Sequence, residues 1–350
     1  MTNQPMKILI IKLGALGDVL RTTPLLTALR KKYPACHVTW IVDRVHRAVL
    51  EANSQIDRLL DVSVETAAWL KSEHFNLAVN LDKEPEATAL LQVSRADKKM
   101  GFALGPEGSL VPADPLSEYA FRLGVEDELK FRQNQKTYQQ ISFEQVGLQF
   151  QKEEYVFSVP EKDASAVEEY LAKIGSPLDS LRHPVIVLNT GSGERFAGKK
   201  LPIESFVKLA EKFHTELKAT VLLLGGNDEI DRNFVIQRTA GVPVVNTGSH
   251  SIFGFAALVR ACDAVVTGDT TAMHIAIAVK TPVMAYFAST CAQEIEMYGR
   301  GQKIVSGISC APCYKKYCPI DEQCMKDMSV DTIFDKTRVL LGAKYATRLS

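Results

Sequence analysis

Short apolar runs alternate with longer amphipathic segments along most of the chain, and this alternation constrains the fold more than any other feature. In the first half, runs of strand length lie at residues 7–11, 38–42, 58–62 and 77–81, and helical periodicity lies between them at 17–33, 45–52 and 66–72. Strands that alternate with helices predict a parallel sheet with helices on both faces.

The same alternation restarts after a stretch at 105–162 that is interrupted by prolines and polar residues. Strands are expected at 185–188, 220–224, 244–246, 264–267 and 283–287, and helices at 203–214, 228–240, 253–261, 271–279 and 330–341. A chain of 350 residues is long enough for two domains of roughly 150 residues each. The pattern predicts two doubly wound α/β halves, in which ligands bind at the carboxyl ends of the strands.

Composition argues against several classes of protein. Lys and Arg number 41 and Asp and Glu number 41, so the net charge is zero, which argues against a polybasic surface for nucleic acid. No stretch approaches the length of a transmembrane helix, and the first apolar run is too short for a signal peptide, so we expect a cytoplasmic protein. The seven cysteines are an odd number and do not fit a secreted disulfide framework.

The turn after the first predicted strand holds the first candidate site. Residues 12–18 read Lys-Leu-Gly-Ala-Leu-Gly-Asp, and Gly14 and Gly17 allow a tight turn into the helix. Asp18 is then either a catalytic carboxylate at the ligand-binding edge or only a favourable charge on the helix dipole. A dinucleotide site is an alternative, with Asp43 at the ribose position. Against it, the loop has two of the three required glycines, and Asp18 would point negative charge at a pyrophosphate.

Two turns in the second half offer contacts for a nucleotide. The turn at 188–193 carries Thr190 and Ser192, and Lys199 follows it, so that hydroxyl groups and a cation are available for phosphate. The alternative for this segment is an ordinary flexible loop with solvated lysines. Glu229 ends the turn at 225–229, where it bonds ribose hydroxyls or merely adds a favourable charge to a helix N-terminus.

A third turn, at 266–274, leads from a strand into a helix. Thr270 and Thr271, together with the N–H groups at the start of that helix, form a natural phosphate site. The alternative is that Asp269 or Thr270 only caps the helix. His274 is either part of the site or a satisfied, half-buried histidine.

Cysteines gather near the C-terminal end of the chain, at Cys310, Cys313, Cys318 and Cys324. The first pair has the spacing of a metal knuckle, and four thiolates can close a tetrahedral zinc or iron site, so segment 310–324 is a candidate structural metal site. The alternative is a reduced cluster without metal. No Asp-x-Asp triplet occurs in the chain, which removes the usual acidic pair that holds a divalent ion on a sugar-nucleotide pyrophosphate.

Together these segments resemble glycosyltransferase family nine, the bacterial ADP-heptose:lipopolysaccharide heptosyltransferases, over nearly the whole chain. The matching motifs are 7–11 with 16–19 and Pro24, then 189–202, 225–229 and 265–281. The resemblance implies a GT-B architecture, in which two Rossmann-like domains face each other across a cleft. It implies an acceptor-binding domain at 1–165, a nucleotide-sugar-binding domain at 166–329, and a helix at 330–350 that returns to the first domain.

The resemblance also implies an activity. The chain is expected to be an inverting glycosyltransferase that moves a heptose from ADP-heptose to an inner-core lipopolysaccharide acceptor without a catalytic cofactor, in peripheral contact with the inner face of the inner membrane. By position, Asp18 matches the general base, Lys199 the phosphate-contacting lysine and Glu229 the ribose contact. The turn of Asp269, Thr270 and Thr271 matches the phosphate-side turn of the family.

The sequence also departs from the family pattern. Ala272 stands where a glycine usually follows the turn, and Leu201 stands where an aromatic residue is often found. The Cys-rich segment resembles the iron-binding cysteine finger of relatives that heptosylate autotransporter proteins, although the extra N-terminal domain of that subgroup is not evident. Heptosylation of a protein or another glycan therefore stays an alternative function. A nicotinamide-dependent oxidoreductase and a non-catalytic sugar-nucleotide-binding protein also stay open.

Overall fold

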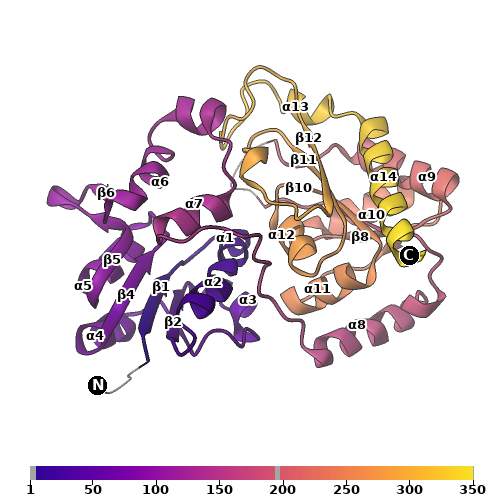
Figure 1. Cartoon of the computed structure of the whole chain (residues 1–350). Helices are drawn as coiled ribbons and strands as arrows, with labels where there is room; N and C mark the ends of the chain where they lie inside the picture. Colours follow the sequence, from indigo (N-terminus) through magenta and orange to yellow (C-terminus); the bar gives the residue numbers. More distant parts are fainter. Residues whose placement is uncertain (1–4, 194–197, 350) are drawn as a thin grey trace. The chain divides into compact units, whose positions relative to one another are not determined.

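The computed structural model of the chain describes residues 5–193 and 198–349, with side chains as far as residue 344. The chain divides into two compact units, the first formed by Met1–Ser158 with Gln293–Glu296 and the second by Val159–Ala292 with Met297–Ser350 (Figure 1). Each unit is built around one six-stranded sheet. The predicted fold class, two doubly wound α/β halves, is confirmed.

The first unit has the strand order β3-β2-β1-β4-β5-β6, with only β6 antiparallel to its neighbour among the described strands. Its strands are β1 (Lys7–Ile11), β2 (His37–Val42), β3 (Arg58–Asp61), β4 (His74–Asn80), β5 (Arg95–Leu104) and β6 (Leu110–Pro112). Its helices are α1 (Leu16–Thr22), α2 (Pro24–Lys32), α3 (Ala48–Glu51), α4 (Val64–Ser72), α5 (Pro85–Val93), α6 (Glu118–Arg122) and α7 (Tyr138–Gln145). The chain order reverses between β1 and β4, and this reversal places the ligand-binding crevice of such a sheet at their carboxyl ends.

Proline explains one difference from the predicted helices. The periodicity at 17–33 predicts a single helix, but the structure has α1 and α2 with a break at Thr23. Pro24 occupies the first position of α2, where its missing N–H is harmless, whereas inside a continuous helix it would remove a hydrogen bond and clash with the preceding turn. The break leaves Asp18 on a helix of only two turns.

The second unit has the strand order β12-β11-β10-β7-β8-β9, and all its described strand pairs are parallel. Its strands are β7 (Val185–Asn189), β8 (Thr220–Leu224), β9 (Val245–Asn246), β10 (Ala264–Gly268), β11 (Val283–Phe287) and β12 (Gly301–Val305). Its helices are α8 (Glu161–Lys173), α9 (Ile203–Leu217), α10 (Ile230–Thr239), α11 (Ile252–Ala261), α12 (Thr271–Ala278), α13 (Gln323–Lys326) and α14 (Val330–Leu349). Its chain order reverses between β7 and β10.

The last helix, α14, packs on the second unit. The Phe334 ring lies 5.4 Å from the Phe213 ring of α9, and both side chains belong to the apolar core that α9, α10 and α14 form on one side of the sheet. Farther along α14, Lys344 Nζ lies 2.8 Å from the buried carboxylate of Asp263, at the amino end of β10. The expected return of this helix to the first domain stays a prediction.

No helix in the described part of the chain is both long enough and apolar enough to cross a membrane.

Candidate active site

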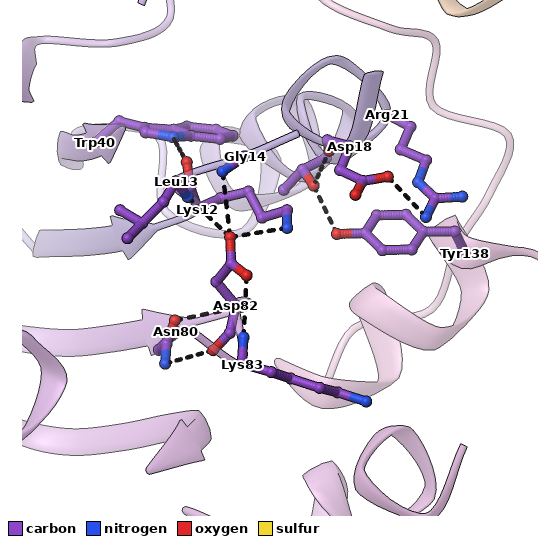
Figure 2. A network of polar contacts seen from close by, with 11 residues as sticks. Lys12, Leu13, Gly14, Asp18, Arg21, Trp40, Asn80, Asp82, Lys83 and Tyr138 are labelled. Carbon is purple, nitrogen blue, oxygen red and sulfur yellow. Dashed lines mark hydrogen bonds and ion pairs between the residues drawn. The ribbon is translucent and has the colours of Figure 1, made fainter. Parts of the chain in front are cut away.

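The loops that follow β1 and β4 meet in a buried polar network in the first unit (Figure 2). One oxygen of Asp82, Oδ2, accepts hydrogen bonds from Lys12 Nζ at 3.0 Å and from the N–H groups of Leu13 and Gly14 at 3.1 and 3.2 Å. The other oxygen, Oδ1, accepts from the N–H of Lys83 at 3.0 Å. The Lys12 and Asp82 side chains are only 6% and 10% exposed, so one buried carboxylate fixes the whole turn at 12–14.

A second layer of hydrogen bonds fixes this carboxylate. The amide group of Asn80, the last residue of β4, donates to the carbonyls of Asp82 and Phe102, and its oxygen accepts from the N–H of Asp82. On the other side, the indole of Trp40 donates to the Lys12 carbonyl at 3.2 Å. Asn80 and Trp40 are fully buried, so these bonds form in a low dielectric, where hydrogen bonds are strong.

This network argues against the dinucleotide alternative. A pyrophosphate binds such a turn through its free N–H groups. Here the N–H groups of Leu13 and Gly14 already donate to Asp82. A phosphate would have to displace a buried carboxylate that also neutralises Lys12.

Asp18 lies in the first turn of α1, beside this network, with its side chain 30% exposed. Its Oδ1 atom lies 2.9 Å from Arg21 Nη2, one helical turn farther on. The guanidinium of Arg21 lies over the ring of Tyr138, 3.9 Å from the ring centroid. The Tyr138 hydroxyl bonds the Thr22 hydroxyl at 2.8 Å, and Thr22 donates to the Asp18 carbonyl at 2.7 Å, so α7 supports α1 at this point.

The two cations beside Asp18 remain charged although they are buried. Burial by itself lowers the pKa of Lys12, but electrostatic interactions with Tyr138, Asp18 and Asp82 raise it above its usual value. Burial likewise opposes the charge on Arg21, and Asp18 is the strongest of the groups that raise the pKa of Arg21. Burial also raises the pKa of the Tyr138 hydroxyl, which therefore stays protonated at neutral pH.

A cavity of about 320 Å³ lies in the second unit, at the carboxyl ends of β7, β8 and β10. Four of the residues predicted from the sequence line it, namely Ser192, Glu229, Thr270 and Thr271. Thr271 begins α12, so the N-terminus of that helix opens on the cavity. This brings together hydroxyl groups, a carboxylate and a helix N-terminus, as a nucleotide site requires.

The other predicted residues of the second unit do not line this cavity, as far as the described residues show it. Thr190 is buried and donates to Asn233 Oδ1. Lys199 Nζ donates to the Asp269 carbonyl at 2.6 Å and lies 3.4 Å from its carboxylate, so this lysine braces the turn that precedes Thr270. His274 is buried within α12. Residues 194–197, inside the motif at 189–202, lie outside the described residues.

Glu229 reaches the cavity from a tightly packed position. Its Oε2 accepts from the N–H of Gly226 at 2.9 Å, and its Oε1 lies 3.1 Å from Lys200 Nζ. Gly191 passes so close that a Cβ there would lie 2.5 Å from the Glu229 carboxyl carbon, so any side chain at this position would displace the Glu229 carboxylate. Glu229 therefore both caps its own turn and presents a carboxylate to the cavity.

Another part of the cavity lining is apolar and includes Ile252, Phe255 and Ile275. His250 joins it, with Nε2 lying 2.6 Å from the Thr247 carbonyl, which requires the proton on Nε2. Burial lowers the pKa of His250 by more than this carbonyl raises it, so the ring is neutral at neutral pH. The cavity thus offers a flat aromatic molecule an apolar, uncharged surface.

The cysteines predicted to bind metal line a separate cavity of about 90 Å³ in the second unit, at Cys310, Cys313, Cys318 and Cys324. Burial raises the pKa of the Cys324 thiol, and the other three thiols raise it further, as expected for sulfurs gathered around one space. Four soft donors suit zinc or iron. Within the described residues, however, no three His, Cys, Asp or Glu side chains come close enough to hold a metal ion.

Several residues of these sites escaped the sequence analysis. Asp82 directly follows a predicted strand, and an acidic residue at that position was an available signal. Arg21 lies three residues beyond Asp18, the spacing at which helical side chains meet. Tyr138 lies 116 residues from its partner Thr22, and no local pattern points to it. Lys200, which pairs with Glu229, lies inside the motif at 189–202 but was given no role.

Comparisons with known proteins identify the family of the chain. A family model described as glycosyltransferase family 9 (heptosyltransferase) matches residues 65–323. The chain is 22% identical over 313 residues to lipooligosaccharide heptosyltransferase 2 of Haemophilus influenzae, which covers 82% of this chain and 85% of the relative. It is 23% identical over 332 residues to lipopolysaccharide heptosyltransferase 1 of Pseudomonas aeruginosa, covering 89% and 87%.

Solved structures show the same fold. A glycosyltransferase family 9 protein of Veillonella parvula superposes with a TM-score of 0.74 at 19% identity, covering 97% of this chain and 98% of the other. The ADP-heptose lipopolysaccharide heptosyltransferase II of Escherichia coli gives 0.69 at 16% identity, covering 97% and 100%. The iron-containing dodecameric glycosyltransferase TibC of enterotoxigenic E. coli gives 0.56 at 9% identity, covering 97% and 77%. Because the family model spans most of the chain, this protein belongs to glycosyltransferase family 9, the heptosyltransferases.

Proposed function

We propose that this glycosyltransferase moves a heptose from ADP-heptose to an inner-core saccharide of lipopolysaccharide, with inversion at the anomeric carbon. The observation that carries the proposal is the cavity at the carboxyl ends of β7, β8 and β10, which combines groups for phosphate, ribose and a base in a member of the heptosyltransferase family. The names of the two curated relatives supply the acceptor class.

The donor nucleotide is assigned to the second unit. Thr270 and Thr271 at the N-terminus of α12, with Ser192 opposite, would hold the phosphates, because free N–H groups and hydroxyls bind phosphate oxygens. Lys199, which braces the same turn, would add a positive charge as the leaving group forms. Glu229 would accept hydrogen bonds from ribose hydroxyls, and the apolar lining would take the adenine.

The acceptor is assigned to the first unit, with Asp18 as the general base. The Asp18 carboxylate takes the proton of an acceptor hydroxyl while that oxygen forms a bond to the anomeric carbon. The bond from this carbon to the phosphate oxygen breaks, and its electron pair leaves with ADP. Attack and departure on opposite faces give inversion.

This reaction needs no metal ion in the proposed scheme. The negative charge on the departing ADP would be stabilised by Lys199 and by the N-terminus of α12. The sequence has no Asp-x-Asp triplet that would place a divalent ion on the pyrophosphate.

The domain assignment follows from these roles. We assign acceptor binding to about 1–165 and donor binding to about 166–329. Since lipopolysaccharide precursors are anchored in a lipid layer, the enzyme would act in peripheral contact with the inner face of the inner membrane.

The cysteine segment is assigned a structural metal site for zinc or iron. Its four thiols line one cavity, and a solved structure of similar fold is described as iron-containing. The thiols would have to move closer together to bind an ion, because no three described ligand side chains are within reach of one metal. A bound metal would tie segment 310–324 together and would supply no chemistry to the transfer. The resemblance of the Cys-rich segment to the cysteine finger of relatives that heptosylate proteins makes a protein acceptor the second candidate, which a transfer assay with both saccharide and protein acceptors would decide.

The base assignment is tested with Asp18→Asn, which keeps the size of the side chain and removes its basicity. Turnover with ADP-heptose should fall on the order of 10²-fold or more, because a general base contributes roughly 10²–10⁴-fold. The affinity for ADP, measured by calorimetry, should not change. Lys199→Ala should weaken ADP binding as well as slow turnover. A folded Asp18→Asn enzyme with near-native turnover would leave Asp18 as a helix charge only.

Nucleotide binding separates the proposal from the remaining alternatives. ADP should protect the second unit from hydrogen exchange and NAD should protect neither unit. Protection of the first unit by NAD would favour an oxidoreductase, and ADP binding without transfer to any acceptor would favour a binding protein.

A further inference from the structure

Arg21 lies in the last turn of α1, where its guanidinium is largely shielded from solvent. Its side chain is only 14% exposed, and its Nη2 lies 2.9 Å from Asp18 Oδ1. Its Nε atom is buried and has no hydrogen-bond partner among the described residues. Its guanidinium directly contacts Asp18 through an ion pair and Tyr138 through a stack on the ring (Figure 2), and the charge of Glu294 acts on it as well.

Tyr138 provides a rigid support for this guanidinium. It is the first residue of α7, whose start is fixed by a capping box between Thr137 and Gln140. Its hydroxyl bonds Thr22, which keeps the ring against α1, and its ring lies 3.9 Å from the guanidinium carbon. A planar cation stacked on a fixed ring loses little freedom when it bonds a carboxylate, and only arginine offers that plane.

Other titratable groups surround the pair. The charged and titratable groups that act on Asp18, Arg21 or their immediate neighbours are Lys12, His46, Asp82, Tyr138, Tyr155 and Glu294. Lys12 is engaged by Asp82 at 3.0 Å, and burial lowers the pKa of His46, so this ring is neutral at neutral pH. Burial raises the pKa of Tyr138 and that of Tyr155, so neither carries charge there.

We infer that Arg21 is the positioning residue for the catalytic base: stacked on Tyr138, it holds the Asp18 carboxylate ionised and in one orientation for the acceptor hydroxyl. The inference rests on the proposed function, since it requires that Asp18 be the base. The inference goes beyond the proposed function because it makes Arg21 the residue that sets the pH range of the reaction. A nearby cation favours the ionised carboxylate and typically extends its working range by one to three pH units.

The test compares the pH dependence of kcat/KM for heptose transfer in Arg21→Gln and Arg21→Lys with that of the unchanged enzyme. In Arg21→Gln the acidic limb should move to higher pH by about one unit, since the acidic limb reports ionisation of the base. In Arg21→Lys the limb should stay near its original pH because the charge remains. Its kcat should still fall severalfold, because an ammonium group cannot stack as a plane.

Arg30→Gln is the matched control. Arg30 also pairs with a carboxylate of the first unit, Asp57, at 2.7 Å, but beside the amino end of β2. Its replacement should leave both the limb and kcat unchanged. ADP affinity should stay within twofold in every variant, and circular dichroism checks that each is folded.

The outcomes separate this inference from the base assignment. If Asp18→Asn is inactive and Arg21→Gln keeps both the original limb and the original kcat, Arg21 has no positioning role and the inference is overturned. An equal loss in Arg21→Gln and Arg21→Lys with an unmoved limb also overturns it, since that result indicates a purely structural contact. Near-native turnover of Asp18→Asn removes the base assignment itself.

Discussion

The prediction that is easiest to refute concerns Asp82, because four donors bond its one carboxylate and its replacement should have a large effect. Replacing it with Asn keeps the shape but removes the negative charge and turns one acceptor oxygen into an NH₂ group, which in either orientation faces a donor that now bonds Asp82. The Lys12 ammonium, 6% exposed, would then be buried without its counter-charge. Breaking a buried ion pair in this way costs about 3–5 kcal/mol, a large part of the roughly 5–15 kcal/mol that stabilises a typical domain.

The measurement is chemical denaturation followed by tryptophan fluorescence. Both tryptophans of the chain, Trp40 and Trp69, belong to the first unit, so the signal reports on the unit that contains Asp82. Trp40 also donates directly to the Lys12 carbonyl. We expect the free energy of unfolding of the first unit to fall by about 3–5 kcal/mol in Asp82→Asn.

Lys12→Met in the same background is the control. This substitution removes the Lys12 charge that Asp82→Asn leaves unpaired, so the double variant should recover at least half of the lost free energy of unfolding. The double-mutant cycle should give a coupling energy between Lys12 and Asp82 of about 2 kcal/mol or more. A loss below about 1 kcal/mol in Asp82→Asn would place this pair among the surface-type ion pairs and refute the reasoning. So would a double variant no more stable than the single one.

Two further predictions concern the second unit. Burial would raise the pKa of Asp263, but hydrogen bonds from Lys344, the Val185 N–H and His183 lower it to about 2. The ionised carboxylate therefore stabilises the fold by about 2–3 kcal/mol above about pH 4, and this stabilisation is lost as the pH falls toward 2. Thermal unfolding followed by far-ultraviolet circular dichroism from pH 6 to pH 2 should show the difference between the unchanged protein and Asp263→Asn shrinking across that range, and a constant difference would contradict the assignment. Purified protein should carry about one zinc or iron per chain, and Cys313→Ser should lose most of it; metal-free protein with full stability and activity would show that the cysteine segment needs no metal.

Strands buried on both faces were predictable from the sequence almost to the residue. β1, β8 and β11 match the predicted bounds because each is a continuous apolar run. β5 was missed because Arg95, Asp97, Lys98 and Lys99 break its apolar pattern, although it pairs with β4 over most of its length. The helix α8 was missed because Pro160 was interpreted as a break, whereas it stands at the N-cap of that helix.

The residues of the candidate sites also divide into those that the sequence could predict and those that it could not. Turns at strand ends were predictable because doubly wound sheets place their ligands there, and four of the predicted side chains share one cavity. The support beneath Arg21 was not predictable in the same way, since Tyr138 comes from a helix in the proline-rich region where no regular pattern exists. Contacts between distant segments are set by packing, and a single sequence carries little trace of it.

The carboxylate of Asp82 makes the two units differ in how they respond to anions in solution. In both units a strand runs into a turn of the kind that attracts phosphate. In the first unit that turn already holds an anion supplied by the chain itself, while in the second unit the corresponding turns open on a cavity. Under the proposed donor assignment, free nucleotides should compete with the donor in the second unit and should not bind the turn at 12–14, so product inhibition by ADP should be competitive toward the donor alone.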